Sequence, residues 1–304
     1  MGGEGRRIRV AVIQRGPAGL DPEANLEENL CLIDEAAKEG PDFIVLNELS
    51  TTPYFCVDRD ARYFRWAQPI PGPATARVGE RARKYECSIV FPLYEEASAG
   101  GPRFNSVAVI GPDGGLIPGE MPDGTRVHRF AKVHLAQTPK TGVDETFFFD
   151  GGPGFPLFST PKAKVGVLVC YDRRFPEGWR ALALQGAEVV FMVADVPAWA
   201  PSSDATAEEM FLVELRTRAL ENLLFVVASN KVGVETVGDK RTRFFGRSCV
   251  LGPTGGVLAE ASSREPAILQ ASIDLEEVTR ARTTLPYFAG RKPETYEILT
   301  RRLS

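Results

Sequence analysis

Short runs of apolar residues alternate with longer segments whose apolar residues recur at helical spacing, and the alternation extends along most of the chain. Runs 42–47, 164–169 and 187–193 are apolar on successive residues, which is typical of strands buried on both faces. Segment 22–38 instead places its apolar residues on one helical face, with Asp21 before it as an N-cap. This alternation predicts an α/β fold in which helices cover a mixed sheet.

The same pattern assigns the other segments. Strands are expected at 8–13, 42–47, 87–91, 105–110, 115–117, 164–169, 187–193, 223–228, 248–251 and 257–259, and helices at 22–38, 73–86, 176–185 and 205–222. The turn sequences GPDG and GPTGG predict two hairpins that close the edges of the sheet, one from 105–110 and 115–117 and one from 248–251 and 257–259.

The 304 residues contain no internal repeat and no linker-like stretch, so we expect a single domain over residues 1–304. Only the Gly-rich start, residues 1–7, is expected to be a loose tail. The apolar runs are far shorter than the about 20 residues that cross a membrane. A net charge of −4 argues against broad attraction to nucleic acid. We therefore expect neither a membrane nor a nucleic acid as partner.

Cysteine and histidine usage narrows the chemistry. There are five cysteines, with no CxxC pair, and two histidines, which favours a reducing, cytoplasmic compartment and no metal site. The sequence has no GxxxxGK[ST], GxGxxG, HExxH or GxSxG motif. Nucleotide-binding, zinc-protease and serine-hydrolase functions therefore have no support from motifs.

Cys170 is the cysteine whose position stands out. It ends the apolar run 164–169 and precedes the helix expected at 176–185. Ligands of α/β folds bind at the carboxyl ends of strands. A helix that begins just after a thiol lowers the thiol pKa, and main-chain N–H groups there can receive an oxyanion. The alternative is a buried structural cysteine, which is the commoner role of a cysteine in general.

Four further residues have chemistry that complements a thiol. Glu48 ends the run IVLNE, Lys132 lies in RFAKVHL together with His134, and Glu145 lies in GVDETFFFDGG. Each alone also fits a plainer role, such as a strand-end acid, a solvated lysine or a structural histidine. Together they form a coherent set, because a thiol needs a base to take its proton and a cation to stabilise the oxyanion.

These motifs resemble those of the nitrilase, or carbon–nitrogen hydrolase, superfamily. The resemblance rests on IVLNELS, RFAKVHL and VCYDRRFPE in this order, and it extends over roughly residues 8–298. It implies a four-layer αββα sandwich with a Glu–Lys–Cys triad. Glu48 would be the general base, Lys132 the oxyanion partner and Cys170 the nucleophile. Glu145 matches a second glutamate that positions the lysine and the substrate.

The segment CYDRRFPE is similar to CNDRRWPE in N-carbamoyl-D-amino-acid hydrolases, whose paired arginines hold the substrate carboxylate. Arg173 and Arg174 occupy those places. The alternative is that an arginine pairs with a structural acid, Glu177 or Asp172. Tyr171 replaces the asparagine of those enzymes, as in general amide hydrolases of the superfamily. Two further differences are Val143 in place of a histidine and the segment MVADVPAW in place of one containing Tyr-Asn.

The sequence is therefore interpreted as a hydrolase, without cofactor or metal, of the carbamoyl C–N bond in an N-carbamoyl amino acid, of the D series by the resemblance. The substrate would be a small molecule with a carboxylate, bound by Arg173, Arg174, His134 and Tyr171. One alternative is a hydrolase of another carboxamide, such as N-carbamoyl-β-alanine, N-carbamoylputrescine or an ω-amide. Another is an inactive relative that acts as an assembly subunit, against which the retained Glu48, Lys132 and Cys170 argue. The resemblance also implies a homodimer or homotetramer.

Overall fold

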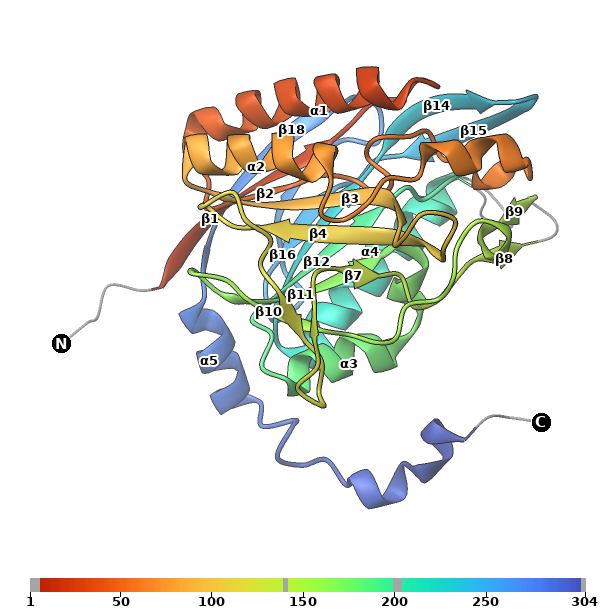
Figure 1. The fold of residues 1–304 in the computed structure, drawn as a ribbon. Coiled ribbons are helices and arrows are strands. Elements are labelled where there is room, and N and C mark those ends of the chain that lie inside the picture. Colours follow the sequence, from red (N-terminus) through yellow and green to blue (C-terminus); the bar gives the residue numbers. More distant parts are fainter. Residues whose placement is uncertain (1–5, 139–141, 199–203, 302–304) are drawn as a thin grey trace.

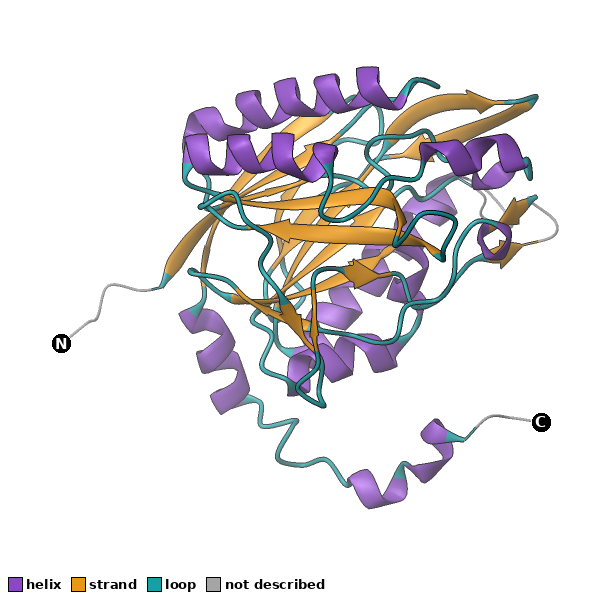
Figure 2. Cartoon of the chain, viewed as in Figure 1, coloured by secondary structure: helices purple, strands orange, loops and turns teal. Residues whose placement is uncertain are grey.

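The computed structural model describes residues 6–138, 142–198 and 204–301. Figure 1 shows two β-sheets packed face to face, with helices covering the outer face of each. This is the predicted four-layer αββα sandwich, and Figure 2 shows the helical and sheet layers by colour. None of the helices in the described part of the chain combines the length and the apolar character of a membrane span.

One sheet contains six strands among the described residues. In spatial order they are β18 (Ala267–Asp274), β1 (Arg7–Gln14), β2 (Phe43–Val45), β3 (Ser88–Glu96), β4 (Arg103–Ile110) and β7 (Phe130–Ala131). Strands β1, β2 and β3 are parallel to one another, and β18, β4 and β7 pair antiparallel with their neighbours. The parallel centre is therefore flanked by antiparallel edges.

The other sheet contains eight strands among the described residues. In spatial order they are β17 (Val257–Glu260), β16 (Cys249–Leu251), β13 (Phe225–Asn230), β12 (Val189–Ala194), β11 (Lys164–Val169), β10 (Leu157–Ser159), β5 (Gly119–Glu120) and β6 (Arg126–Val127). Its centre, β11, β12 and β13, is again parallel. Two small antiparallel pairs lie outside the two sheets: β14 (Val232–Val237) with β15 (Lys240–Phe245), and β8 (Gln137–Thr138) with β9 (Val143–Asp144).

Helices cover both sheets. α1 (Pro22–Ala36) and α2 (Pro73–Tyr85) pack on the six-stranded sheet, and α3 (Pro176–Leu184) and α4 (Asp204–Asn222) pack on the other side of the sandwich. The predicted N-cap is confirmed, because the Asp21 side chain accepts a hydrogen bond from the main-chain N–H of Glu23 at 3.0 Å. The remaining helices are α5 (Glu276–Thr284) and the short 3-10 helices η1 (Ala37–Glu39), η2 (Phe55–Val57), η3 (Ala61–Trp66), η4 (Glu145–Phe147), η5 (Cys170–Arg174), η6 (Pro293–Thr295) and η7 (Glu297–Thr300).

The main core lies between the two sheets. Side chains of β1, β2 and β3 meet those of β11, β12 and β13 in one cluster of buried residues. Phe43 of β2 and Phe191 of β12 are in contact across the interface, with ring centroids 5.2 Å apart. A second cluster fills the space between α1, α2 and the six-stranded sheet. Strands buried on both faces explain why the central runs are apolar at every position.

Several predicted boundaries are wrong, and each error has a structural reason. β3 continues past Phe91 to Glu96 because β4 pairs with it along its whole length. Segment 115–117 forms only an isolated bridge of Leu116 with Ile110, since the chain crosses to the other sheet at β5. The predicted tail is too long, because β1 begins at Arg7. Residues 1–5 of that tail lie outside the described part.

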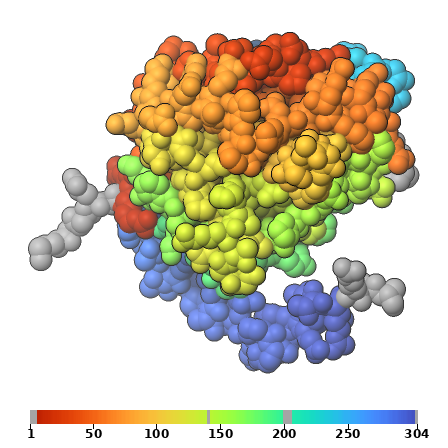
Figure 3. Space-filling view, in the orientation of Figure 1, coloured from red at the N-terminus to blue at the C-terminus, as the bar shows by residue number. Residues whose placement is uncertain are grey.

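Some elements were not predicted at all. β15 (KRTRFF) is mainly charged or polar, so the apolar pattern does not reveal it. β14 (VGVETV) and β18 (AILQASID) are mainly apolar, but polar residues interrupt both runs. α5 is predominantly polar. Beyond α5, residues 285–301 extend away from the two sheets, as the blue segment in Figures 1 and 3 shows.

Candidate active site

The carboxyl ends of parallel strands from both sheets meet in one buried region. Glu48 follows β2 of the six-stranded sheet, and Cys170 follows β11 of the eight-stranded sheet. Asp195 and Lys231 follow β12 and β13 in the same way. Ligand sites of α/β folds lie at this end of the strands, because the chain turns there and exposes polar groups.

Lys132 joins the two glutamates that the sequence singled out. Its Nζ lies 2.9 Å from Glu48 Oε1 and 2.6 Å from Glu145 Oε1. All three side chains are completely buried. One ammonium and two carboxylates in an apolar surrounding are costly to desolvate and persist only when they are closely paired. We refer to these three residues as the Lys132 cluster.

Both oxygens of Glu48 are held by donors. Oε1 accepts from Asn105 Nδ2 at 2.7 Å in addition to Lys132, and Oε2 accepts from the main-chain N–H of Asp195 at 2.9 Å. The donors come from β4, from the segment after β7 and from the end of β12, and therefore from both sheets. This arrangement fixes the orientation of the Glu48 carboxylate.

Glu145 is held in a similar way. Its Oε1 accepts from Tyr54 Oη at 2.9 Å and its Oε2 from the main-chain N–H of Ala136 at 2.7 Å. Burial raises the pKa of Glu145, although Lys132 opposes the shift. Burial alone would lower the pKa of Lys132, but the facing carboxylates outweigh it and the pKa is raised well above its ordinary value. Lys132 therefore stays an ammonium, able to stabilise negative charge nearby.

Cys170 occupies a strained turn. Its φ is +44°, in the left-handed region that a non-glycine residue rarely adopts, at the junction of β11 and η5. Its side chain is buried, and this burial, with help from the Glu48 charge, raises the thiol pKa, whereas Lys132 and Arg173 oppose the rise. The expectation of a lowered pKa is therefore wrong, because desolvation outweighs the local positive charges. The thiol needs a proton acceptor to become nucleophilic.

Comparisons with known proteins agree with this geometry. The sequence model of the family described as carbon-nitrogen hydrolase matches residues 9–283. The chain belongs to the carbon-nitrogen hydrolase family. It is 33% identical to an N-carbamoylputrescine amidase of Oryza sativa subsp. japonica, over 98% of this chain and 96% of that protein. It is 31% identical to a citrullinase of Francisella tularensis, over 97% of this chain and 99% of that protein.

A solved structure gives the same result for the fold. The crystal structure of a carbon-nitrogen hydrolase from Helicobacter pylori superposes with a TM-score of 0.86 at 28% identity, covering 98% of this chain and 99% of that one. The protein is therefore a hydrolase that acts on non-peptide C–N bonds. Membership of the family agrees with an enzyme rather than with an inactive assembly subunit.

Hydrogen bonds to the Asp172 side chain stabilise the turn after Cys170. The buried Asp172 carboxylate accepts from the main-chain N–H of Val169 at 3.2 Å and from that of His134 at 2.9 Å. His134 also places Nδ1 2.8 Å from Asp172 Oδ1 and stacks on Phe175, with ring centroids 3.6 Å apart. In the hydrolase, His134 thus lies beside the turn that follows Cys170, where Asp172 and Phe175 hold its ring. Tyr171 follows Cys170 in the chain and packs edge-on against Phe175.

Arg173 and Arg174 share one acid. Arg173 Nε lies 3.0 Å from Glu214 Oε2, and Arg174 Nη1 pairs with Glu214 Oε1. Arg173 is buried and also donates from Nη1 to the main-chain oxygen of Cys170 at 3.0 Å. The acid that pairs with both arginines is Glu214 of α4, not Glu177 or Asp172. Arg173 therefore lies beside Cys170, and both arginines are already paired with a carboxylate.

Sequence reasoning missed several residues that hold the site. They are Tyr54, Asn105, Asp195, Lys231, Glu235 and Glu214, with contacts described above and below. Asn105 carries the clearest sequence signal, as a polar residue inside the apolar strand FNSVAVI. Glu235 lies in β14, a strand that was not predicted, and the others lie in loops or in α4, where a polar residue is ordinary. In the described part of the chain, no three His, Cys, Asp or Glu side chains come together as a metal site.

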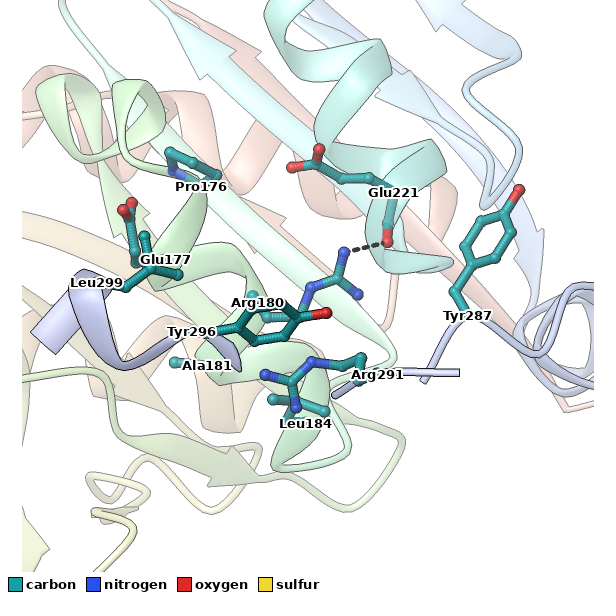
Figure 4. Close-up of a pocket in the computed structure, with 10 residues that line it drawn as sticks. All are labelled: Pro176, Glu177, Arg180, Ala181, Leu184, Glu221, Tyr287, Arg291, Tyr296 and Leu299. Atoms are coloured by element: carbon teal, nitrogen blue, oxygen red, sulfur yellow. Dashed lines mark hydrogen bonds between the residues drawn. The ribbon is translucent and has the colours of Figure 1, made fainter. Parts of the chain in front are cut away.

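An open pocket lies elsewhere on the hydrolase. It measures about 520 Å³ and separates α3 from the C-terminal segment. Figure 4 shows its lining residues, among which Arg180 Nη2 donates to the main-chain oxygen of Glu221 at 2.7 Å. Neither the Lys132 cluster nor Cys170 lines it. This pocket is therefore distinct from the catalytic region.

Proposed function

We propose that the chain hydrolyses the terminal carbamoyl group of an N-carbamoyl amine, with N-carbamoylputrescine as its foremost substrate. The observation that carries the proposal is the buried contact of Lys132 with Glu48 and Glu145 behind Cys170, in a chain similar over nearly its whole length to an N-carbamoylputrescine amidase. Citrulline, the substrate that the name citrullinase implies, also ends in a ureido group, which is the chemistry that the two names share.

The proposed reaction uses three side chains. Cys170 Sγ attacks the carbamoyl carbon while Glu48 accepts the thiol proton, which forms the C–S bond. Lys132 and the main-chain N–H of Tyr171 stabilise the oxyanion. The bond from the carbamoyl carbon to its terminal NH₂ nitrogen then breaks, and Glu48 returns the proton to that nitrogen, which leaves as ammonia. Glu48 next takes a proton from water, which attacks the thioester carbon and releases the thiol. The resulting carbamic acid decomposes, so that one water converts the substrate into amine, ammonia and carbon dioxide.

The pairing of the arginines bears on the rest of the substrate. Arg173 and Arg174 both bind Glu214, so their positive charge is partly neutralised before any substrate arrives. This supports a substrate whose distal end is not a carboxylate. The N-carbamoyl amino acid predicted from sequence remains the second candidate, because Arg173 Nη1 lies only 3.9 Å from Cys170 Sγ. His134 and Tyr171 are proposed to line the substrate site beside them.

An ammonia-release panel tests the proposal. Purified enzyme is assayed with N-carbamoylputrescine, citrulline, N-carbamoyl-β-alanine, N-carbamoyl D- and L-amino acids and simple ω-amides. C170A serves as the inactive control and shows that release comes from this enzyme. The highest kcat/KM is expected for N-carbamoylputrescine. A clear preference for N-carbamoyl amino acids would favour the second candidate, and turnover of simple amides alone would reject both.

We further propose that the enzyme forms a homodimer or homotetramer in a reducing cytoplasmic compartment. Exposed apolar residues of the C-terminal segment support self-association, since Ile298 and Leu299 are 61% and 63% exposed. Leu184 on α3, which lines the pocket of Figure 4 together with Leu299, is 47% exposed. Light scattering on the intact chain and on I298E/L299E tests it. The intact chain should be larger than a monomer and the variant smaller than the intact assembly; two monomers would reject the proposal. The free state of all five cysteines supports the compartment.

A further inference from the structure

A second lysine is buried between two acids near the first cluster. Lys231 Nζ lies 2.7 Å from Asp195 Oδ2 and 2.7 Å from Glu235 Oε1, and all three side chains are buried. Glu235 in addition accepts from the main-chain N–H of Ala18 at 2.7 Å. We refer to these residues as the Lys231 cluster. Like the Lys132 cluster, it places one buried lysine between two buried carboxylates.

The Lys231 cluster is directly connected to the general base. The main-chain N–H of Asp195 donates to Glu48 Oε2 at 2.9 Å. Asn47, the residue before Glu48, donates from Nδ2 to Asp195 Oδ1 at 2.8 Å and to the main-chain oxygen of Glu48 at 3.0 Å. The Asp195 carboxylate is therefore fixed by Asn47 and Lys231 while its own N–H holds Glu48.

The two clusters are also connected on their far sides. The main-chain N–H of Tyr54 donates to Glu235 Oε2 at 2.8 Å, and its hydroxyl donates to Glu145 Oε1 at 2.9 Å. Hydrogen bonds and ion pairs thus form a closed ring through Glu145, Lys132, Glu48, Asp195, Lys231, Glu235 and Tyr54. Displacing one member of the ring is expected to disturb Glu48.

Stability alone is a weak reason for such a cluster. Burying three charges is costly, and well-packed apolar residues of similar volume are often at least as stable. An electrostatic role is a stronger reason. The Asp195 carboxylate is held close to Glu48, and like charges oppose each other's ionisation in a buried site. Lys231 offsets that negative charge, because it lies on Asp195 from the other side.

We propose that Lys231, acting through Asp195, is a positioning residue for the reaction: it anchors the N–H that holds Glu48 and offsets the carboxylate that faces Glu48. The proposal rests on the roles proposed above for Glu48 and Cys170, not on the identity of the substrate. The charged and titratable groups that face Glu48 in the described part of the chain are Lys132, Cys170, Asp195, Glu145, Tyr54 and Cys56. Lys231 acts on this set through Asp195.

Alkylation of Cys170 by iodoacetamide tests the proposal without a substrate. The rate is measured against pH by mass spectrometry of the Cys170 peptide. The rate is expected to rise with pH, because alkylation requires the Cys170 thiol to lose its proton. The peptide that contains the exposed Cys31 gives an internal reference for reagent and pH. Failure of the proposed substrate would leave this readout intact, so the two proposals fail separately.

Three substitutions separate charge from structure. K231M removes a positive charge and should move the acid limb of the profile upward by about one pH unit, the size expected for a unit charge several Å away. D195N removes a negative charge but keeps the N–H, and should move the limb downward. K231M/D195N should bring it back near wild type. K231R, which can pair with both carboxylates, should behave like wild type. Turnover of K231M should fall by about tenfold or more in kcat with little change in KM.

R129M is the matched control. Arg129 pairs with the buried Glu95, so its loss also leaves a buried carboxylate without its cation, but neither residue contacts the Lys231 cluster. Its profile should coincide with wild type. The proposal is overturned if the alkylation profile of K231M coincides with that of wild type. It is also overturned if the profile of K231M/D195N is displaced as far as that of K231M. If K231M does not fold, D195N decides: a downward shift supports the proposal and an unchanged profile overturns it.

Discussion

Replacing Glu48 by glutamine isolates proton transfer, because the side chain keeps its shape and loses its ability to accept a proton. Three donors converge on the carboxylate, from Lys132, Asn105 and the main-chain N–H of Asp195. Glutamine offers one acceptor oxygen and one NH₂ group. One of the donors must then face another donor, which should lower the free energy of unfolding by about 1–3 kcal/mol.

The loss of turnover should be larger than this structural cost. An ordinary thiol with a pKa of about 8.5 is only about 9% ionised at pH 7.5. Burial raises the pKa of the Cys170 thiol, so the fraction of thiolate is smaller still when no base is present. A positioned general base typically contributes about 10²- to 10⁴-fold. We therefore expect E48Q to lower kcat for ammonia release by about this factor at neutral pH.

The assay is ammonia release across neutral and alkaline pH, with thermal unfolding recorded on the same preparations. E48Q should regain activity only in alkali, where the thiol loses its proton directly to solvent. E95Q is the control, because Glu95 is a buried carboxylate bonded to Ser106 outside the site. It should lose stability but keep turnover. A folded E48Q with kcat within about tenfold of wild type at neutral pH would refute the role of Glu48 as proton acceptor.

Other substitutions and conditions test neighbouring parts of the argument. C170A should abolish ammonia release while circular dichroism stays unchanged, and residual turnover within about tenfold of wild type would exclude Cys170 as nucleophile. Y54F removes the hydroxyl that donates to Glu145 at 2.9 Å. Because loss of a hydrogen bond to a charged group is costly, kcat/KM should fall about ten- to a hundredfold. Wild-type activity of Y54F would count against a role for that contact. Burial raises the pKa values of Tyr54 and Cys170, and of Cys87 to about 11. The folded state therefore binds more protons than the unfolded state above about pH 9, and the free energy of unfolding should fall with pH there by up to about 1.4 kcal/mol per pH unit per group. A melting temperature that rises between pH 9 and 10 would contradict this sign.

The alternation of strands and helices along the chain and the positions of Glu48 and Cys170 at strand ends follow from local pattern. Both residues end apolar runs, and ligand sites of α/β folds lie at the carboxyl ends of strands, so each can be predicted to lie at such a site. That the two ends meet depends on how β2 of one sheet faces β11 of the other. The contacts of Lys132 depend on how two sheets face each other, which no local pattern contains. The contacts of Asp195 and Glu235 cannot be predicted from local pattern either, because these residues meet Lys231 only when β12, β13 and β14 have assembled.

The thiol and the arginines show a different limit. The start of a helix near Cys170 is visible in the sequence, but the completeness of its burial is a tertiary property, and burial decides the direction of the thiol pKa. The partner of Arg173 lies 41 residues further along, on α4. A search among nearby acids therefore finds Glu177 and Asp172 but not Glu214. Strands β14, β15 and β18 were not predicted because polar residues interrupt their sequences, and a strand that packs on one face needs only part of the apolar pattern.

Glu214 gives the last prediction, since it decides how much positive charge the arginines offer to a substrate. Its carboxylate binds Arg173 Nε at 3.0 Å and pairs with Arg174. E214Q would remove the negative charge and leave both guanidinium groups free to bind another acid. The kcat/KM for N-carbamoyl-β-alanine should then rise relative to that for N-carbamoylputrescine.

The size of the change follows from exposure. Arg173 is 5% exposed but Arg174 is 36% exposed, so solvent screens part of the gain and about 1 kcal/mol, or five- to tenfold in the ratio, is expected. E177Q removes an equal charge from the exposed first turn of α3 and is the control, with an unchanged ratio. An E214Q ratio equal to that of E177Q would show that the arginines do not face the substrate. A fall in the ratio of kcat/KM for N-carbamoyl-β-alanine to that for N-carbamoylputrescine would mean that Glu214 holds Arg173 in the position that a carboxylate substrate requires. That result would favour an N-carbamoyl amino acid over N-carbamoylputrescine as the substrate.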